Sequence, residues 1–286
     1  GLTDRTRVGI IDKGSIRWDH EDLNYETGPG SPTTSKSKVR GGWEFFKDDD
    51  FNPWLRGKYF GGHPTACAGI IAAFRNNDLG VAGIAGGDWS GSSNNKNGGV
   101  DLYSFILEEP NGDADKESMA RAINMGYSSG GLDFRLDIMN ISMGFNSTSI
   151  KIENALQLAA QNEMIVVCSR GNSGDNVERT PATYFDNMVI SVGASDNSGN
   201  LLSSSNFGRN MDLIAPGSSD LIWTTGADAV DDYTSFKNTS AAAAHVSGAV
   251  ALMHDYLQEH NPSSNRDNVL SPVDAEYFLE QSATAK

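Results

Sequence analysis

Short, uniformly apolar segments alternate with helical segments along most of this chain. A strand whose successive residues are all apolar is buried on both faces, which is typical of parallel sheets covered by helices on each side. The pattern therefore predicts an α/β fold of three layers, with a mainly parallel central sheet between two layers of helices. We predict strands at residues 8–11, 41–46, 102–107, 138–142, 165–168, 189–192 and 213–214, and helices at 64–74, 116–125, 150–161, 239–258 and 272–281.

The length of the chain is compatible with one domain. Its 286 residues exceed the usual size of a domain, but α/β enzymes often bury a single core at this length. The segment 86–99 is too polar and too rich in glycine to pack, so we expect a surface loop there. No internal repeat is visible, and we expect residues 1–286 to form a single domain.

The charge and the cysteine content exclude some classes of protein. A formal net charge of −15 and a pI near 4.6 argue against nucleic acid or an anionic membrane as a partner, because no basic cluster is present to neutralise phosphates. No apolar run approaches about 18 residues, so we expect neither a spanning helix nor a signal peptide in this sequence. Cys67 and Cys168 are the only cysteines, and they give no disulfide framework from which to infer a compartment.

A serine lies where a loop meets an Ala-rich apolar helix. At such a junction the N–H groups and the positive end of the helix dipole stabilise a developing oxyanion, so Ser240 is placed as an acyl-transfer nucleophile would be. The alternative is that Ser240 or Thr239 is an ordinary N-cap. Two further residues favour the interpretation of Ser240 as a nucleophile. Asp12 ends an apolar strand, and His63 stands just before a second small-residue helix with Pro64 at its first helical position.

The order Asp12, His63, Ser240 and the sequences around these residues resemble the subtilase family, the serine endopeptidases of the subtilisin and proteinase K type. The family pattern around the histidine is His-Gly-Thr-His-Val-Ala-Gly-x-Ile-Ala. This chain reads His63-Pro-Thr-Ala-Cys-Ala-Gly-Ile-Ile-Ala, and its departures are Pro64, Ala66 and Cys67.

The sequence around the serine resembles the family in the same way. The family pattern is Gly-Thr-Ser-Met-Ala-x-Pro-His-Val-x-Gly, and this chain reads Asn238-Thr-Ser-Ala-Ala-Ala-Ala-His-Val-Ser-Gly, with departures at Asn238, Ala241 and Ala244. The segments 140–144, 166–174, 189–194, 205–208 and 214–217 also match family segments in the family's order. The resemblance covers nearly the whole chain and implies a subtilisin-like fold.

The resemblance also implies an oxyanion hole and a substrate site. Asn172, which by itself indicates only a turn, would donate its side-chain amide to the oxyanion together with the Ser240 backbone N–H. An extended peptide would pair with one strand edge beside the primary pocket. The predicted substrate-binding residues are Ser142, Met143 and Gly144 on one side of this pocket and Ser169, Arg170 and Gly171 on the other. Which of Arg170, Glu178 and Arg179 points into the pocket stays open.

The function implied by the resemblance is hydrolysis of peptide bonds in proteins through an acyl-enzyme. Ser240 would attack, His63 would accept its proton, and Asp12 would hold the imidazole. His20 and His245 are expected to be structural. Two alternatives stay open: a catalytically weak pseudoenzyme that acts as a binding module, suggested by the departures from the motifs, and a transpeptidase or macrocyclase.

The resemblance implies that the chemistry needs no cofactor, with structural Ca²⁺ as an option. Residues 48–50 are three aspartates that would serve as oxygen ligands or form a solvated acidic turn, and no ligands are assigned. The implied partners are protein or peptide substrates and an inhibitory prosegment, and we expect a monomer. Subtilases are generally secreted as precursors, so we expect a secreted, processed catalytic domain. Asn140, Asn146 and Asn238 lie in N-glycosylation sequons, and a glycan on Asn238 would lie beside the proposed nucleophile Ser240. The sequence therefore favours a source without N-glycosylation, such as a bacterium.

Cys67 lies four residues after His63, about one helical turn, so the two side chains are expected to share a helix face. The proteinase K branch of the family has cysteine at this position. We expect Cys67 to be an inert small core residue whose modification by a bulky group would nevertheless displace His63.

Overall fold

The computed structural model of the chain describes residues 5–24, 37–45, 49–51, 60–88, 99–108, 114–128, 135–184, 187–218, 222–260 and 270–284. Asp48 and residues 89–98 of the predicted surface loop lie outside this part of the chain, as do the side chains of Asp49 and Asp50. Within the described residues, no helix combines the length and the apolar character needed to cross a membrane.

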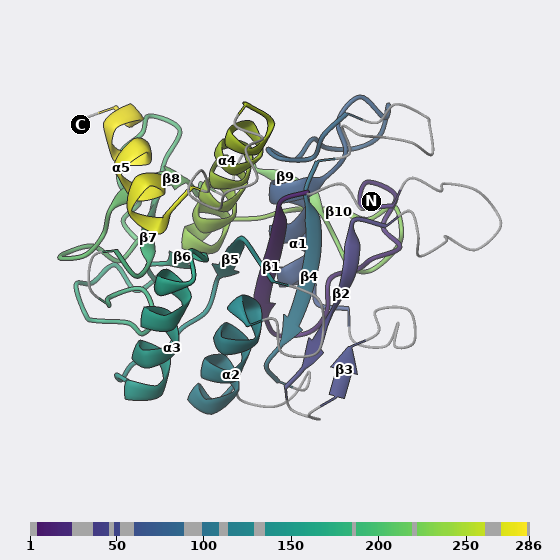
Figure 1. Cartoon of the computed structure of the whole chain (residues 1–286). Helices are drawn as coiled ribbons and strands as arrows, with labels where there is room; N and C mark the ends of the chain where they lie inside the picture. The colour runs from purple at the N-terminus through teal and green to yellow at the C-terminus, as the bar shows by residue number, and fades with distance from the viewer. Residues whose placement is uncertain are drawn as a thin grey trace.

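An eight-stranded sheet forms the centre of the molecule (Figure 1). Its order is β3-β2-β4-β1-β5-β6-β7-β8, and all neighbouring pairs are parallel except β2 with β3. The strands are β1 (Arg7–Asp12), β2 (Val39–Glu44), β3 (Asp49–Phe51), β4 (Asp101–Ile106), β5 (Ile138–Ile141), β6 (Ile165–Ser169), β7 (Ile190–Ser195) and β8 (Leu213–Pro216). A separate antiparallel pair consists of β9 (Trp223–Thr225) and β10 (Tyr233–Ser235).

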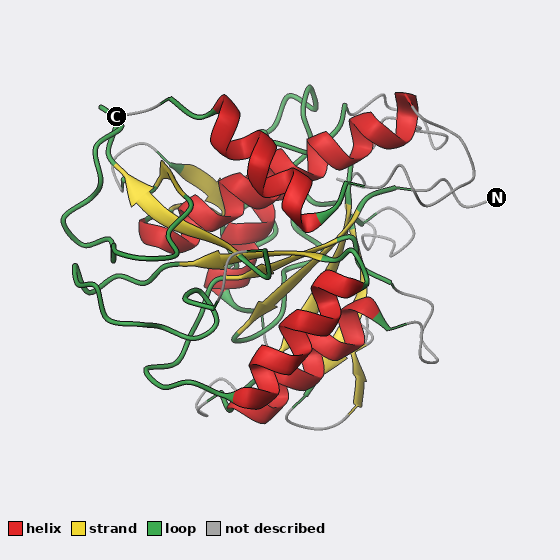
Figure 2. Cartoon of the chain, turned by 60° about the vertical axis from the view of Figure 1, so that its left-hand side comes forward, coloured by secondary structure: helices red, strands yellow, loops and turns green. Residues whose placement is uncertain are grey.

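Helices cover both faces of the sheet, as Figure 2 shows. On one face, α1 (Gly62–Ala72), α4 (Asn238–His260) and α5 (Pro272–Ser282) contribute to a core with residues such as Val8, Leu102 and Val167. On the other face, α2 (Lys116–Tyr127) and α3 (Ile150–Gln161) form a second core with the opposite sides of the same strands. The predicted α/β fold, with a mainly parallel sheet between two helical layers, is confirmed.

Every predicted strand and helix is found, with ends that shift by at most three residues. The prediction that Pro64 opens its helix is wrong, because α1 begins two residues earlier, at Gly62, after the cap residue Gly61. Proline is tolerated there because the N–H groups of the first helical turn have no intrahelical partner in any case. The three-residue strands β3, β9 and β10 were not predicted, since such short segments show too few alternations to be recognised.

The carboxyl ends of the parallel strands lie along one edge of the sheet. β1 ends at Asp12, β5 is followed directly by Ser142, and β6 ends at Ser169, three residues before Asn172. Since β1, β5 and β6 are neighbours in the sheet, segments that are far apart in the sequence meet at this edge. Ligand and active sites of open α/β sheets occur at such edges.

Candidate active site

Asp12, His63 and Ser240 form a continuous chain of hydrogen bonds. The His63 Nδ1 lies 2.5 Å from Oδ2 of Asp12, and its Nε2 lies 3.0 Å from Oγ of Ser240. A carboxylate only accepts, so Nδ1 carries the proton, and in the neutral imidazole Nε2 is then free to accept from the serine hydroxyl. This is the tautomer in which a histidine can take a proton from a nucleophile.

Each of the three side chains is placed by a different element of the fold. Asp12 is the last residue of β1, and its second oxygen, Oδ1, accepts from the N–H of Lys13 at 2.7 Å. His63 is the second residue of α1, and Ser240 is the third residue of α4. Both helices therefore begin over the carboxyl end of the sheet, where Asp12 lies.

The surroundings of His63 alter its proton affinity. Burial alone lowers the pKa of His63, but the charge of Asp12 and the hydrogen bond to it together outweigh this effect, so that the pKa is raised from its ordinary value of 6.5. Asp12 is only 3% exposed, which keeps water from competing for its contact with the imidazole. The ring of Phe236 packs edge-on against His63, with centroids 5.1 Å apart. Asp12 therefore stabilises the protonated imidazole of His63, the form that a histidine base takes after it has accepted a proton.

The carboxamide of Asn172 is held in a definite orientation. Its Oδ1 accepts from the backbone N–H of Thr239 at 3.0 Å and from the Thr239 hydroxyl at 2.7 Å. Because a backbone N–H can only donate, the atom that it meets must be the oxygen, and the Asn172 NH₂ group is left to donate elsewhere. The residue is exposed and lies next to Ser240 through its contact with Thr239. A donor fixed beside a nucleophile is what stabilisation of an oxyanion requires.

The side chain of Asn206 holds the loop that carries Asn172 through two hydrogen bonds. Oδ1 of Asn206 accepts from the N–H of Ser173 at 2.8 Å, and its Nδ2 donates to the carbonyl of Arg170 at 3.3 Å. Gly171 has a φ of +109°, and a Cβ atom there would lie 2.5 Å from Nδ2 of Asn206. Glycine at 171 thus permits both the backbone conformation and the close approach of Asn206.

A buried polar network lies beneath Ser240. Ser142 Oγ accepts from Nδ2 of Asn140 at 3.0 Å, and Oδ1 of Asn140 accepts from the hydroxyl of Ser247 at 3.0 Å. The Ser142 hydroxyl lies 3.5 Å from the carbonyl of Ser240, and the Ser240 hydroxyl lies 3.4 Å from the carbonyl of Ser142. This network ties the end of β5 to α4. Since Asn140 is fully buried, its sequon is inaccessible to a glycan in the folded chain.

Cys67 also belongs to these surroundings. Its thiol is fully buried and lies 3.8 Å from Oγ of Ser142. Burial raises the pKa of Cys67 well above its ordinary value, and the charge of Asp12 raises it further. The sulfur, a carboxylate oxygen of Asp12 and a ring nitrogen of His63 all lie within 4.8 Å of one another. The thiol is therefore close to the imidazole and stays protonated.

The residues predicted to bind substrate lie on adjacent strand ends. β5 pairs with β6 through Ile141 and Cys168, so the segments 142–144 and 169–171 leave the sheet side by side. The Arg170 side chain is 1% exposed and donates through Nη2 to the carbonyls of Phe207 and Arg209. The backbone N–H of Arg170 donates to the carbonyl of Val192 at 2.9 Å, and its carbonyl accepts from Nδ2 of Asn206 at 3.3 Å, so its side chain and both backbone groups are paired within the fold. Arg179 pairs with Asp175 at 3.2 Å.

His20 and His245 lie apart from this hydrogen-bond chain. His20 is fully buried, and its Nε2 lies 2.6 Å from the carbonyl of Asp232. Nδ1 of His245 lies 2.8 Å from the carbonyl of Ala241, one turn earlier in α4. Neither histidine contacts Ser240 in the described part of the structure.

Sequence reasoning missed the residues that orient the site. Thr239 contacts Asn172, Phe236 packs against His63, Asn140 donates to Ser142 and accepts from Ser247, and Asn206 holds the loop that carries Asn172. Thr239, Ser247, Asn140 and Asn206 lie in segments that match the family, but the match does not show which side chains they contact. Phe236 lies outside the matched segments.

Comparisons with known proteins show the family and the fold of the chain. The family model described as the Subtilase family matches residues 3–286. Subtilisin Savinase of Lederbergia lenta is 30% identical over 268 residues, which cover 92% of this chain and 80% of that protein. The major intracellular serine protease of Bacillus subtilis (strain 168) is 33% identical over 258 residues, covering 88% and 69%. A crystal structure of a cold adapted subtilisin-like serine proteinase has a TM-score of 0.71 at 24% identity, covers 97% of this chain and 82% of that chain, and supports the fold.

Proposed function

The chain belongs to the subtilase family and is a subtilisin-like serine protease, and from this premise we propose that Asp12, His63 and Ser240 are its catalytic triad. The observation that carries the proposal is the unbroken chain from the Asp12 carboxylate through the imidazole to the Ser240 hydroxyl. The substrate class is protein or peptide, since the family hydrolyses peptide bonds.

In the proposed mechanism the Ser240 hydroxyl attacks the scissile carbonyl while His63 Nε2 takes its proton. Asp12 keeps the imidazole in the required tautomer and stabilises the imidazolium. The C–N bond then breaks as His63 returns the proton to the leaving amine, leaving an acyl-enzyme on Ser240. A water molecule attacks the ester carbonyl, His63 again accepts a proton, and the carboxylic acid product departs as the proton returns to Oγ.

The oxyanion hole of this mechanism is proposed to consist of the Asn172 NH₂ group and the Ser240 backbone N–H. The fixed acceptor contacts of Asn172 Oδ1 support this role, because they aim the NH₂ group without using it. We propose that a peptide pairs with the 142–144 edge by β-augmentation and that the adjacent 169–171 segment borders the pocket beside it.

The test uses denatured casein with and without a serine-directed fluorophosphonate. We expect hydrolysis of casein that the reagent abolishes, and we expect mass spectrometry to locate the label on Ser240. An unlabelled, inactive but folded chain would point to a pseudoenzyme. Ligated products in the presence of an added amine would point to a transpeptidase. Hydrolysis that survives complete labelling of Ser240 would refute the assigned nucleophile.

We further propose that residues 1–286 act as one catalytic domain and that the reaction uses only the side chains and backbone of the chain. Structural calcium and a monomeric state stay proposals, and no calcium ligands are assigned. Secretion also stays a proposal, because two of the matching relatives are named as intracellular proteases. Activity measured in the medium and in lysed cells of the native host, with the protein traced by an antibody, tests it.

A further inference from the structure

Arg179 lies between the two segments that border the proposed primary pocket. Its neighbour Thr180 pairs with Phe145, because the N–H of Phe145 donates to the carbonyl of Thr180 at 2.7 Å and the N–H of Thr180 donates back at 3.0 Å. The carbonyl oxygen of Thr180 lies 2.6 Å from the position that a Cβ atom on Gly144 would take. Cγ of Arg179 lies 3.6 Å from the corresponding position on Gly171, which is ordinary van der Waals contact. Residues 179 and 180 thus contact both borders of the pocket.

Both the backbone and the charged end of Arg179 are held in place. Its carbonyl accepts from the N–H of Thr183 at 3.0 Å and from the Thr183 hydroxyl at 3.1 Å. Its Nη2 donates to Oγ of Ser173 at 3.3 Å and to Oδ2 of Asp175 at 3.2 Å. Because Ser173 directly follows Asn172 in the chain, the positive charge is held close to the proposed oxyanion hole. The side chain of Arg179 is nevertheless 18% exposed, so it remains accessible to a substrate.

The guanidinium of Arg179 has hydrogen-bond donors left, whereas its acidic neighbour Asp175 has a contact on each oxygen. Nε and Nη1 of Arg179 make no hydrogen bond within the part of the chain that the structure describes. Oδ2 of Asp175 accepts from Arg179, and its Oδ1 accepts from the N–H of Val177 at 3.2 Å. Glu178 is exposed, so solvent and salt screen its charge. The hydrogen-bonding capacity that remains at the pocket is therefore that of a cation, which suits a carboxylate.

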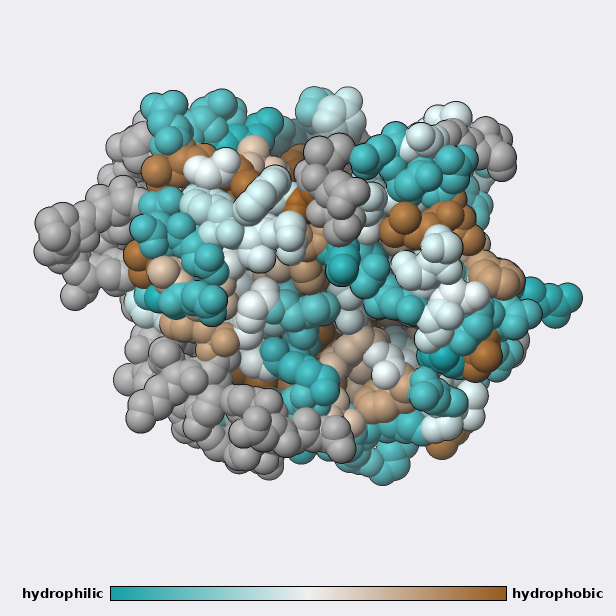
Figure 3. Space-filling model, turned by 180° about the vertical axis from the view of Figure 1, so that it is seen from behind, coloured by the Kyte–Doolittle hydropathy of each residue, from teal (hydrophilic) through white to brown (hydrophobic). Residues whose placement is uncertain are grey.

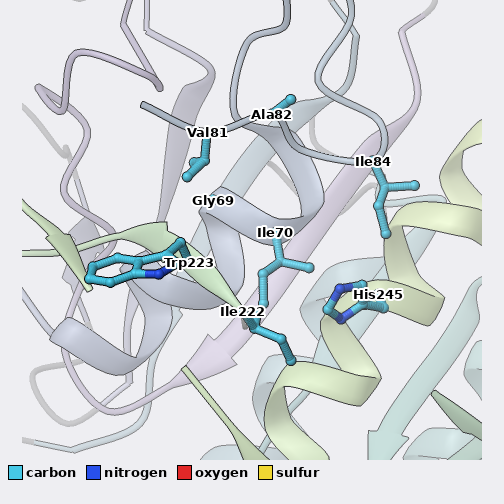
Figure 4. A pocket seen from close by; sticks show the side chains of 8 residues that line it. All are labelled: Gly69, Ile70, Val81, Ala82, Ile84, Ile222, Trp223 and His245. Atoms are coloured by element: carbon cyan, nitrogen blue, oxygen red, sulfur yellow. The ribbon is translucent and has the colours of Figure 1, made fainter. Parts of the chain in front are cut away.

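Other places in the molecule are less suited to recognise a substrate side chain. Arg170 is 1% exposed, so its guanidinium is not accessible to a peptide. The pocket in Figure 4 lies between α1, α4 and the start of the β9 segment, and none of its lining residues belongs to the segments proposed to border the substrate. On the face seen in Figure 3, the described apolar residues form separate patches among hydrophilic ones, which argues against a continuous apolar groove on that face.

We propose that Arg179 determines the specificity of the primary pocket by binding the side-chain carboxylate of an aspartate or glutamate at P1, the substrate residue whose carbonyl Ser240 attacks. This inference rests on the proposed function, because only the attack of Ser240 defines a P1 residue. A carboxylate at P1 gains charge-assisted hydrogen bonds from the unpaired donors of Arg179. An apolar side chain would remove water from the guanidinium without giving it a partner, and a lysine or arginine side chain would be repelled.

The first test varies the substrate. Initial rates give kcat/KM for peptide p-nitroanilides that differ only at P1, with glutamate, glutamine, phenylalanine or lysine at that position. Glutamine has the shape of glutamate without its charge, so kcat/KM should be about 10- to 150-fold higher for glutamate, as expected for hydrogen bonds to a charged group. The values for phenylalanine and lysine should also be below that for glutamate. A value for any of the other three that equals or exceeds that for glutamate would overturn the proposal.

The second test varies the protein. Arg179→Gln removes the charge and should abolish the preference for glutamate over glutamine, whereas Arg179→Lys keeps the charge and should keep a preference. Arg75→Gln is a matched control, because Nη2 of Arg75 also pairs with an aspartate, Asp88, at 3.0 Å, but Arg75 lies outside the pocket borders. This control should keep the full preference. Circular dichroism checks that each variant is folded. A preference that survives Arg179→Gln would assign it to another residue.

Binding to the Ser240→Ala variant keeps failure of this inference distinct from failure of the proposed function, because binding needs no hydrolysis. Isothermal titration calorimetry compares N-acetylated peptide amides whose last residue is glutamate or glutamine. Tighter binding of the glutamate peptide, lost when Arg179→Gln is added, supports the inference even where the wild-type chain hydrolyses nothing. Hydrolysis of casein together with equal binding of the two peptides leaves the protease proposal standing and overturns the role of Arg179.

Discussion

Replacing Thr239 by valine should reduce turnover without removing any group that reacts. The hydroxyl of Thr239 donates to Oδ1 of Asn172 at 2.7 Å and accepts from the N–H of Gly171 at 3.2 Å, and valine has nearly the same shape without these two hydrogen bonds. The backbone N–H of residue 239 still donates to Oδ1 of Asn172 at 3.0 Å. The carboxamide thus keeps one of the two contacts that hold it, and the NH₂ group proposed to bind the oxyanion is less well fixed.

The magnitude follows from the one hydrogen bond of the Thr239 hydroxyl that holds the Asn172 carboxamide, since the other, from Gly171, does not contact it. A net loss of about 0.5–1.5 kcal/mol in the orientation of Asn172 corresponds to a decrease in kcat of about 2- to 12-fold. Asn172→Ala removes the donor itself and should lower kcat by roughly 10²- to 10³-fold, the range measured for one oxyanion-hole donor in subtilisin. In both variants KM should change little, because an oxyanion exists only in the transition state.

A double-mutant cycle on a peptide substrate gives the decisive measurement. If Thr239 acts through Asn172, Thr239→Val should have little further effect in the Asn172→Ala background. Thr225→Val is a matched control, because Thr225 is also a buried threonine whose hydroxyl donates within the fold, but it does not contact Asn172. The same decrease in kcat in both backgrounds, or an equal decrease in the control, would refute the reasoning.

Three further predictions concern the triad and its surroundings. Ser240→Ala should leave a folded chain whose peptidase activity is lower by several orders of magnitude, and wild-type turnover in the purified variant would remove Ser240 from the mechanism. In the proposed mechanism the neutral form of His63 is the base, and the pKa of His63 is raised, so kcat/KM should fall as the pH decreases through a value on the alkaline side of 6.5; a profile that is flat down to pH 5 would contradict a histidine base. Organomercurials should inhibit the enzyme through Cys67 while iodoacetamide has little effect, because the thiol is buried and protonated. Cys67→Val should be active and insensitive to mercury, whereas a Cys168→Ala variant should stay sensitive; the reverse pattern would assign the effect to Cys168.

The fold was predictable because the sequence patterns that indicate its strands and helices are local and recur along the chain. Most strands of the parallel sheet are short apolar segments, and α2, α3 and α5 each follow a residue whose side chain caps the helix, namely Asp115, Ser149 and Ser271. The strands β9 and β10 gave no such signal, because each is only three residues long.

The candidate site was predictable only in part, because many of its contacts join segments that are far apart in the sequence. The proposed reacting residues stand in motifs whose roles the resemblance implies, whereas the residues that orient them lie in matched segments that do not indicate their contacts. Asn206 holds the Asn172 loop from more than 30 residues away, and Ser247 on α4 donates to Asn140 on β5. The side chain of Arg170 illustrates the limit. Its position in a matched segment placed it at the pocket, but its direction depends on the carbonyls of Phe207 and Arg209.

The departures from the family motifs occur where the fold constrains volume or backbone conformation, not where a reacting atom is needed. Asn238 replaces a glycine at a φ of +69°, and asparagine is among the residues that best tolerate this left-handed conformation. The other departures are small or apolar side chains buried against the sheet or between α1 and α4, and they are Pro64, Ala66, Cys67, Ala241 and Ala244. Small side chains at these positions let the two helices pack closely enough for Nε2 of His63 to lie 3.0 Å from Oγ of Ser240. The substitutions that motivated a pseudoenzyme are therefore compatible with the hydrogen-bond chain from Asp12 through His63 to Ser240.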